Sequence, residues 1–138
     1  VNVVTTLGPG VDPTTLGAQP NNVLVASYLP QALVLPRCSA VVSHVGAGTV
    51  LGALCFGLPQ LALPQGTDQP QNAAALVASG AGICLTPDEI TPEAIATALD
   101  RVLHEPQFRS CAEKIQGEIA ELPTAEAALD ELLASITG

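Results

Sequence analysis

The chain has 138 residues, enough for one domain with a buried core, and 48% of them are hydrophobic. Its only aromatic residues are two Phe and one Tyr, so Ala, Val, Leu and Ile must build the core, which favours closely packed layers of helices on a sheet. The formal net charge is −9 and four residues are Lys or Arg, which excludes a nucleic acid as partner and disfavours an anionic membrane surface.

Short Val-rich runs alternate with longer helical patterns along the chain, which predicts parallel strands joined by crossover helices. The predicted strands are 1–6, 23–27, 40–44, 60–63 and 82–85. The predicted helices are 47–57, 69–79, 92–104, 107–121 and 124–136. Residues 8–22 are rich in Gly, Pro, Asn and Asp, so they are expected to form a surface loop. The fold class is therefore α/β, a parallel sheet with helices on both faces.

The helix expected at 92–104 has the best-marked start, because Thr91 can cap it and Pro92 suits its first position. No apolar run has the length of a membrane span, and no segment has the pattern of a signal peptide. The four cysteines form no C-x-x-C pair and are expected to be reduced core residues. Together these features predict a cytoplasmic protein.

The stretch "SHVGAGT", residues 43–49, carries an apolar strand directly into glycines at the start of a helix. Such a turn leaves backbone N–H groups unpaired at the positive end of the helix dipole, which is an anion site. Gly46 and Gly48 let a phosphate approach the backbone, Thr49 adds a hydroxyl, and His44 adds a ring N–H. The alternative is an ordinary tight turn, with His44 as a hydrogen-bonded strand end.

Two other phosphate-binding motifs also place glycines between a strand and a helix. A Walker-type loop is excluded because it needs a lysine beside its last glycine, whereas the one lysine of the chain is Lys114. A dinucleotide-binding fingerprint stays open, since "GAGTVLG" follows a strand and Asp68 stands about where a ribose-binding acid is expected. That fingerprint normally follows the first strand of its unit, whereas here two strands precede it.

A second polar group follows the next strand, in "GTDQPQNAAALV". Asp68 and Gln69 stand together at the carboxyl end of a strand, where ligands bind in open α/β sheets. They can hold neighbouring hydroxyls of a sugar, or they can be helix caps and nothing more. A glycine turn for phosphates beside an acid–amide pair for hydroxyls describes a site for a sugar nucleotide.

Residues 28–73 resemble the donor-binding signature of nucleotide-sugar-dependent glycosyltransferases of the GT-B fold, which has two Rossmann-like domains. The resemblance is strongest to actinobacterial enzymes that glycosylate natural products. It rests on aromatic-x-Pro-Gln, His-x-Gly-x-Gly-Thr, Gly-x-Pro-Gln and Asp-Gln-x-x-Asn-Ala, which occur here in the family's order and spacing. The resemblance thus implies a Rossmann-like fold that forms one half of a GT-B enzyme.

The resemblance also implies roles for single residues. The positions that match the family's donor-pyrophosphate site are His44, Gly46, Gly48 and Thr49. Asp68 and Gln69 match the residues that bind the hydroxyls of the transferred sugar, and Tyr28 and Gln31 match those that support the nucleoside base. For Tyr28, packing on Leu33 as a strand-end aromatic is the alternative.

Three positions depart from the family's usual His-His-Gly-Gly-Ala-Gly-Thr and its plant variants. Ser43 replaces the first histidine and Val45 the first glycine, so the closeness of phosphate approach at Val45 is in question. Gly52 stands where plant relatives have a ribose-binding Glu, so the ribose must be recognised elsewhere.

The resemblance implies that residues 1–138 are a single donor-binding domain of a longer enzyme. The family's donor domain begins one strand and one helix before the position of Val1, and an acceptor domain with the catalytic base precedes it, so this chain supplies no catalytic residue. The implied function is the donor half of an inverting glycosyltransferase, which transfers a hexose or deoxyhexose from a UDP- or dTDP-sugar to a natural-product acceptor without metal or cofactor. The alternatives are a dinucleotide-binding domain of an NAD(P)-dependent oxidoreductase and a non-catalytic scaffold of the same fold.

Overall fold

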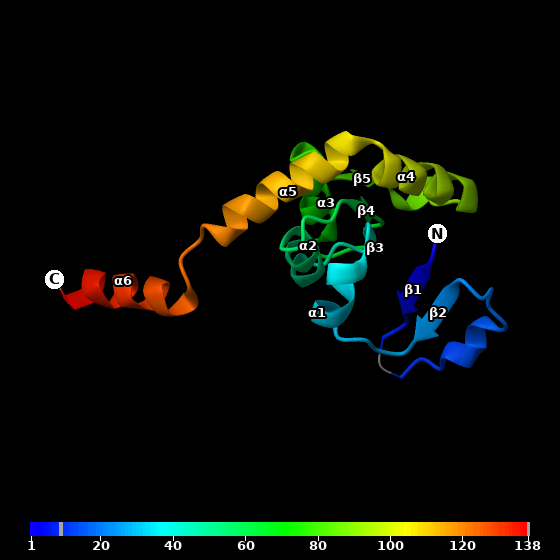
Figure 1. Cartoon of the computed structure of the whole chain (residues 1–138), viewed down its shortest axis with the longest axis horizontal. Coiled ribbons are helices and arrows are strands. Elements are labelled where there is room, and N and C mark those ends of the chain that lie inside the picture. The colour runs from blue at the N-terminus through cyan, green and yellow to red at the C-terminus, as the bar shows by residue number, and fades with distance from the viewer. Residues whose placement is uncertain (9, 138) are drawn as a thin grey trace. The chain divides into compact units, whose positions relative to one another are not determined.

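The computed structural model describes residues 1–8 and 10–137 and divides the chain into two compact units, Val1–Arg37 and Cys38–Gly138 (Figure 1). Pro9, within the loop expected at 8–22, lies outside the described residues. Each unit has its own parallel sheet.

The first unit is a pair of parallel strands with short helical segments. Its elements are β1 (Val3–Thr6), the 3-10 helix η1 (Pro13–Leu16), β2 (Val23–Ala26), α1 (Gln31–Val34) and the 3-10 helix η2 (Leu35–Arg37). Val3 of β1 is opposite Val23 of β2, and the pairing continues to the end of both strands. Inside the expected loop, the Asp12 carboxylate accepts a hydrogen bond of 2.9 Å from the Thr14 N–H, which caps η1.

The second unit has a three-stranded parallel sheet in the order β3-β4-β5. Its strands are β3 (Val41–Ser43), β4 (Gln60–Ala62) and β5 (Gly82–Cys84). Ser43, Ala62 and Cys84 lie opposite one another, so the three strands end at the same level. The loops that follow them therefore leave from one edge of the sheet.

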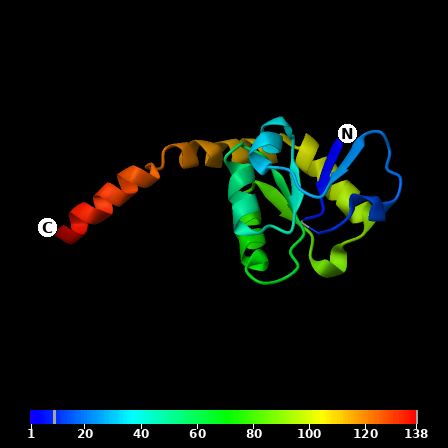
Figure 2. The ribbon, with the colours of Figure 1, turned by 90° about the horizontal axis from the view of Figure 1, so that it is seen from below.

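Helices cover both faces of this sheet, as the sequence predicts. The helices of the second unit are α2 (Ala47–Leu54), α3 (Gln69–Ala78), the 3-10 helix η3 (Pro87–Glu89), α4 (Pro92–His104), α5 (Pro106–Ala120) and α6 (Ala125–Thr137). The main core lies between the sheet and α2, α3 and α5, whereas α4 covers the opposite face of the sheet (Figure 2). The buried residues of this main core are Val45, Val50, Leu54, Ala62, Ala73, Leu76, Ala81 and Ala112.

Helix boundaries follow their capping residues. The Thr91 hydroxyl accepts a hydrogen bond of 3.1 Å from the Ala94 N–H, which confirms the predicted start of α4. Helix α2 ends at Leu54, three residues before the end expected at residue 57, because Gly57 has a φ of +62° and turns the chain toward Pro59. Cys55 is exposed as a result, so the expectation of a core cysteine is wrong at this position, whereas Cys84 and Cys111 pack against the core.

One arginine holds the edge of the sheet from which the strands start. The Arg109 guanidinium, on α5, donates a hydrogen bond of 3.1 Å to the Gly57 carbonyl and another to the Ser39 carbonyl. Both carbonyls belong to segments that lead into β4 and β3. Arg109 therefore braces the edge opposite to the one where the strands end.

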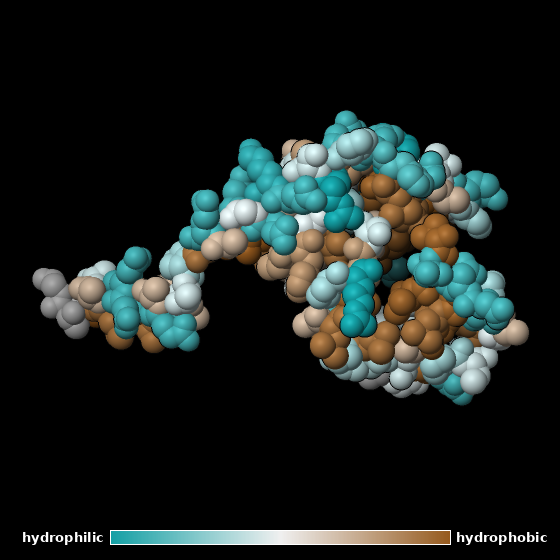
Figure 3. Space-filling model, viewed as in Figure 1, coloured by the Kyte–Doolittle hydropathy of each residue, from teal (hydrophilic) through white to brown (hydrophobic). Residues whose placement is uncertain are grey.

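Every side chain of α6 whose burial is described, residues 125–136, is exposed. Apolar side chains nevertheless follow one another along this helix, and Figure 3 shows them at its surface. They are Leu129, Leu132, Leu133 and Ile136. Within the described part of the chain, no helix is both long and apolar enough to cross a membrane.

The packing of β5 yields a prediction about glycine. A Cβ added at Gly82 would collide with the Gln60 carbonyl oxygen and stand 2.9 Å from Cδ2 of Leu76, so Gly82→Ala should lower the free energy of unfolding by about 1–3 kcal/mol. Gly117 on α5 has open space around it, so Gly117→Ala should raise that free energy by up to about 1 kcal/mol. Urea unfolding of the two variants measures both changes, and equal effects of the same sign would contradict this packing.

Candidate functional site

The turn between β3 and α2 has an unusual backbone. Val45 has a φ of +58°, although it is β-branched, and its side chain is completely buried. The left-handed region is strained for such a residue, by roughly 1–3 kcal/mol. The Ser43 hydroxyl stabilises the turn by accepting a hydrogen bond of 3.0 Å from the Val45 N–H. Ser43 thus has a local structural role at the position where the family usually has histidine.

The start of α2 is open for an anion. Gly46 is the N-cap residue and provides no side-chain cap, while its carbonyl accepts hydrogen bonds from the N–H groups of Thr49 and Val50. Among the described residues, no hydrogen bond uses the N–H of Ala47 or Gly48. A Cβ placed on Gly48 would meet nothing within 4 Å. The first amides of α2 are therefore accessible at the positive end of the helix dipole.

His44 lies beside this opening. Its side chain is exposed, and Nε2 would be 3.0 Å from a Cβ added at Gly46, so the ring lies over that glycine. The ring is also close enough to Asp68 for a protonated His44 to help lower the pKa of that carboxyl. The structure therefore brings His44, the glycine turn and Asp68 together.

Asp68 follows β4 at the same edge of the sheet, and both of its carboxylate oxygens are held. Oδ1 accepts a hydrogen bond of 3.0 Å from the Thr67 hydroxyl, and Oδ2 accepts one of 2.8 Å from Nδ2 of Asn72. The bond from Asn72 is the largest cause that lowers the pKa of Asp68, and the bond from Thr67 is the next. An exposed carboxylate held in this way is ionised at neutral pH and can still accept hydrogen bonds from hydroxyl groups.

Gln69 supports its own loop. Its Oε1 accepts hydrogen bonds from the N–H groups of Gln65 at 2.7 Å and Gly66 at 3.1 Å. Its Nε2 makes no hydrogen bond with any described residue, so it can donate to a ligand. The interpretation of this pair as simple helix caps does not hold for Asp68, whose side chain makes no capping bond to α3.

Asn72 is the asparagine of Asp-Gln-x-x-Asn-Ala, and it was assigned no role from the sequence. Its Nδ2 donates to the Val45 carbonyl at 3.0 Å as well as to Asp68, so it joins the loops that follow β3 and β4. The sequence contained one sign of the contact with Asp68, because Asn72 stands four residues after Asp68 on a helix and such residues share a face.

Tyr28 and Gln31 belong to the first unit, whereas the turn after β3 and the loop after β4 belong to the second. They line a hollow of about 310 Å³ at the carboxyl ends of β1 and β2, together with Thr6, Gly8, Ser27 and Leu29. The hydroxyls of Thr6 and Ser27 were not singled out in the sequence. Tyr28 and Leu33 are each 69% exposed, so Tyr28 is not buried by packing on Leu33.

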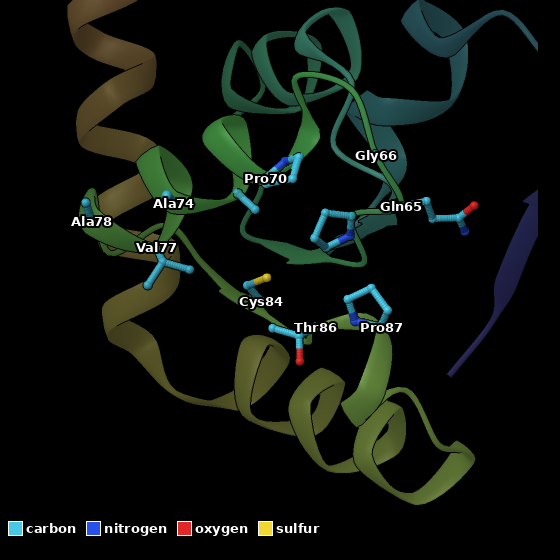
Figure 4. A pocket seen from close by; sticks show the side chains of 11 residues that line it. Gln65, Gly66, Pro70, Ala74, Val77, Ala78, Cys84, Thr86 and Pro87 are labelled. Carbon is cyan, nitrogen blue, oxygen red and sulfur yellow. The ribbon is translucent and has the colours of Figure 1, made fainter.

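A larger pocket of about 590 Å³ lies on the face of α3 opposite to Asp68 and Asn72. Pro70, Ala74 and Val77 of α3 face Cys84, Thr86 and Pro87 across it (Figure 4). Its lining is mainly apolar, and none of the residues expected to bind phosphate or sugar lines it. Burial raises the pKa of the Cys84 thiol, which keeps it protonated.

Metal ligands do not gather in the described part of the chain, where no three His, Cys, Asp or Glu side chains are placed to hold an ion.

The family model described as "Erythromycin biosynthesis protein CIII-like, C-terminal domain" matches residues 2–134. The chain belongs to this family. The elloramycin glycosyltransferase ElmGT of Streptomyces olivaceus is 42% identical to this chain over 114 residues, which are 83% of this chain and 28% of the relative. The 10-deoxymethynolide desosaminyltransferase of Streptomyces venezuelae is 34% identical over 82% of this chain and 26% of its own length.

Solved structures agree with the family assignment. The calicheamicin glycosyltransferase CalG4 matches with a TM-score of 0.90 and 30% identity over 96% of this chain and 35% of that one. Glycosyltransferase VinC, solved in complex with dTDP, matches with a TM-score of 0.88 and 32% identity over 96% of this chain and 33% of that one. These matches confirm the α/β fold expected from the sequence, a Rossmann-like half of a GT-B glycosyltransferase. They give no support to the oxidoreductase alternative.

The two loops of the site yield a prediction about backbone strain. Thr67 is exposed and has a φ of +57°, so Thr67→Gly should raise the free energy of unfolding by about 1 kcal/mol, despite the lost bond to Asp68. Val45→Gly relieves a similar strain but removes a fully buried side chain, so it should lower that free energy by about 1 kcal/mol or more. Urea unfolding of both variants measures these changes, and a loss for Thr67→Gly would show that the strain at this position is smaller than the combined cost of the lost hydrogen bond and of the added freedom of the unfolded chain.

Proposed function

We propose that this chain is the nucleotide-sugar donor-binding part of an inverting glycosyltransferase, which transfers a hexose or deoxyhexose from an NDP-sugar to a natural-product acceptor. The observation that carries the proposal is the open N-terminus of α2, with His44 beside it and the Asp68 carboxylate at the same sheet edge. The chain covers about a third or less of its relatives, so the activity belongs to a longer protein of which it is a part.

The donor pyrophosphate binds against the first amides of α2. Gly46 and Gly48 give the phosphates access to the backbone, Thr49 offers its hydroxyl, and His44 donates from its ring. As the bond to the sugar breaks, negative charge grows on the leaving diphosphate. The oriented amides and a protonated His44 stabilise this charge more strongly in the transition state than in the bound donor.

The transferred sugar binds to Asp68 and Gln69. The Asp68 carboxylate accepts hydrogen bonds from sugar hydroxyls, and Nε2 of Gln69 donates a hydrogen bond to a sugar oxygen. The nucleoside base binds in the hollow lined by Tyr28 and Gln31, where a pyrimidine of UDP or dTDP stacks on the exposed ring. The relative VinC was solved with dTDP, which supports a diphosphate ligand of this kind.

The proposal assigns no cofactor and no metal to the chain, because amide dipoles and His44 meet the charge of the diphosphate. The catalytic base that deprotonates the acceptor, and the acceptor site itself, are assigned to parts of the longer enzyme that this chain does not include. We also propose that the enzyme is cytoplasmic. Residues 1–138 together are proposed to form one donor-binding domain.

Binding of three ligands to the chain tests the proposal. Calorimetric titration with inorganic pyrophosphate, dTDP and dTDP-glucose should show binding of all three, whereas NADH should not bind. His44→Ala should weaken pyrophosphate and dTDP roughly 10- to 100-fold, because it removes a hydrogen bond to a charged group. Asp68→Ala should leave the affinity for dTDP unchanged and remove the extra affinity for dTDP-glucose.

Matched controls keep these results specific. His104 on α4 and Asp130 on α6 are exposed, and neither lies in a loop that follows a strand of the sheet, so His104→Ala and Asp130→Ala should bind like the unaltered chain. Binding of NADH without pyrophosphate or dTDP would overturn the proposal, and binding of none of them would favour the scaffold alternative. A lower melting temperature of His44→Ala with unchanged affinity would make His44 a structural residue only.

A further inference from the structure

Asn72 uses both hydrogens of its side-chain amide at once. Nδ2 donates to Oδ2 of Asp68 at 2.8 Å and to the Val45 carbonyl oxygen at 3.0 Å. A primary amide nitrogen has two hydrogens, so this donor is fully occupied. The side chain is partly buried between the start of α3 and the turn after β3.

The two acceptors come from different loops. Val45 belongs to the turn that leads into α2, and its left-handed backbone sets the direction of its carbonyl. Asp68 is the N-cap residue of α3, and its other carboxylate oxygen is held by Thr67, which also has a positive φ. Asn72 is thus the side chain that connects a strained turn at the phosphate side to the carboxylate at the sugar side.

We propose that Asn72 is a positioning residue, which fixes the distance and orientation between the phosphate-binding turn and the Asp68 carboxylate. This inference rests on the proposed function. In an NDP-sugar the sugar is bonded to the diphosphate, so the ligand itself has a fixed spacing between these groups. A site that matches this spacing in advance binds the donor without first ordering two separate loops.

The chemistry of the contact explains why the residue is asparagine. Aspartate at position 72 would have the same shape but no hydrogen-bond donor. Its carboxylate oxygens would then repel the Val45 carbonyl oxygen and the Asp68 carboxylate. Alanine would leave the Val45 carbonyl without this donor and Asp68 held through Oδ1 alone. In either case the turn and the carboxylate would move independently.

The first measurement does not depend on a ligand. The pKa of Asp68 is followed by carbon-13 NMR of its carboxyl group in the unaltered chain, in Asn72→Ala and in Asn72→Asp. His44 is the charged group that acts on Asp68 in the unaltered chain, and both variants retain it. We expect the pKa of Asp68 to rise in Asn72→Ala and to rise further in Asn72→Asp. Gln71→Ala, at the exposed neighbouring position, is the control and should leave it unchanged.

The second measurement compares dTDP with dTDP-glucose by calorimetric titration. Asn72→Ala should reduce the preference for dTDP-glucose over dTDP about tenfold, because Asp68 is no longer held in place. In an Asp68→Ala background the same substitution should reduce that preference no further, since Asn72 acts through Asp68. A merely structural role would instead weaken both ligands by one factor and lower the melting temperature.

The outcomes separate this inference from the proposed function. An unchanged pKa of Asp68 in Asn72→Ala, or equal weakening of both ligands, overturns the positioning role while dTDP binding by the unaltered chain upholds the proposed function. Failure of the unaltered chain to bind either ligand overturns the proposed function and the sugar-positioning role with it. A raised pKa together with a reduced preference supports both.

Discussion

The parallel pairing of β3, β4 and β5 is the constraint on which the site depends. Because Ser43, Ala62 and Cys84 lie opposite one another, the strands end at one level and their loops meet at one edge. His44 and Asp68 are distant in sequence, yet this pairing brings them within electrostatic reach. Helices on both faces bury the sheet, so function is confined to the loops at its edge.

Backbone strain is concentrated in these same loops. Among the described residues, Val45 and Thr67 are the non-glycine residues with positive φ, and each lies in a loop that follows a strand of this sheet. Such conformations persist when surrounding contacts hold them. Burial of Val45 and its bonds to Ser43 and Asn72 provide this support in one loop, and the bonds of Gln69 to Gln65 and Gly66 provide it in the other. The strain is therefore part of how the two loops are shaped.

The sequence predicts elements well where local chemistry decides them. The Val-rich strands, the cap at Thr91 and the glycine turn are local features, and the structure has each within a few residues of its expected position. Contacts between loops are different, since nothing near Asn72 in the sequence reveals that it meets the Val45 carbonyl, 27 positions earlier. The sequence also contained no sign of the left-handed backbone at Thr67, because threonine does not favour that conformation. The roles of the eight predicted site residues remain predictions, and the structure shows the geometry of the loops that carry them.

The positions of the cationic side chains affect how fast an anionic ligand associates with the site. The Lys and Arg side chains of the second unit all lie on α4 and α5; they are Arg101, Arg109 and Lys114. Arg109 donates hydrogen bonds to carbonyls at the sheet edge opposite to the site. Arg101 forms an ion pair with Glu105. A diphosphate would then be held by short contacts to amides while the chain's net charge of −9 repels it from afar. Added salt screens repulsion beyond about 8–10 Å but changes contacts at hydrogen-bond distance much less. The association rate of such a ligand should therefore increase with ionic strength, the reverse of the behaviour of a site built from lysine and arginine.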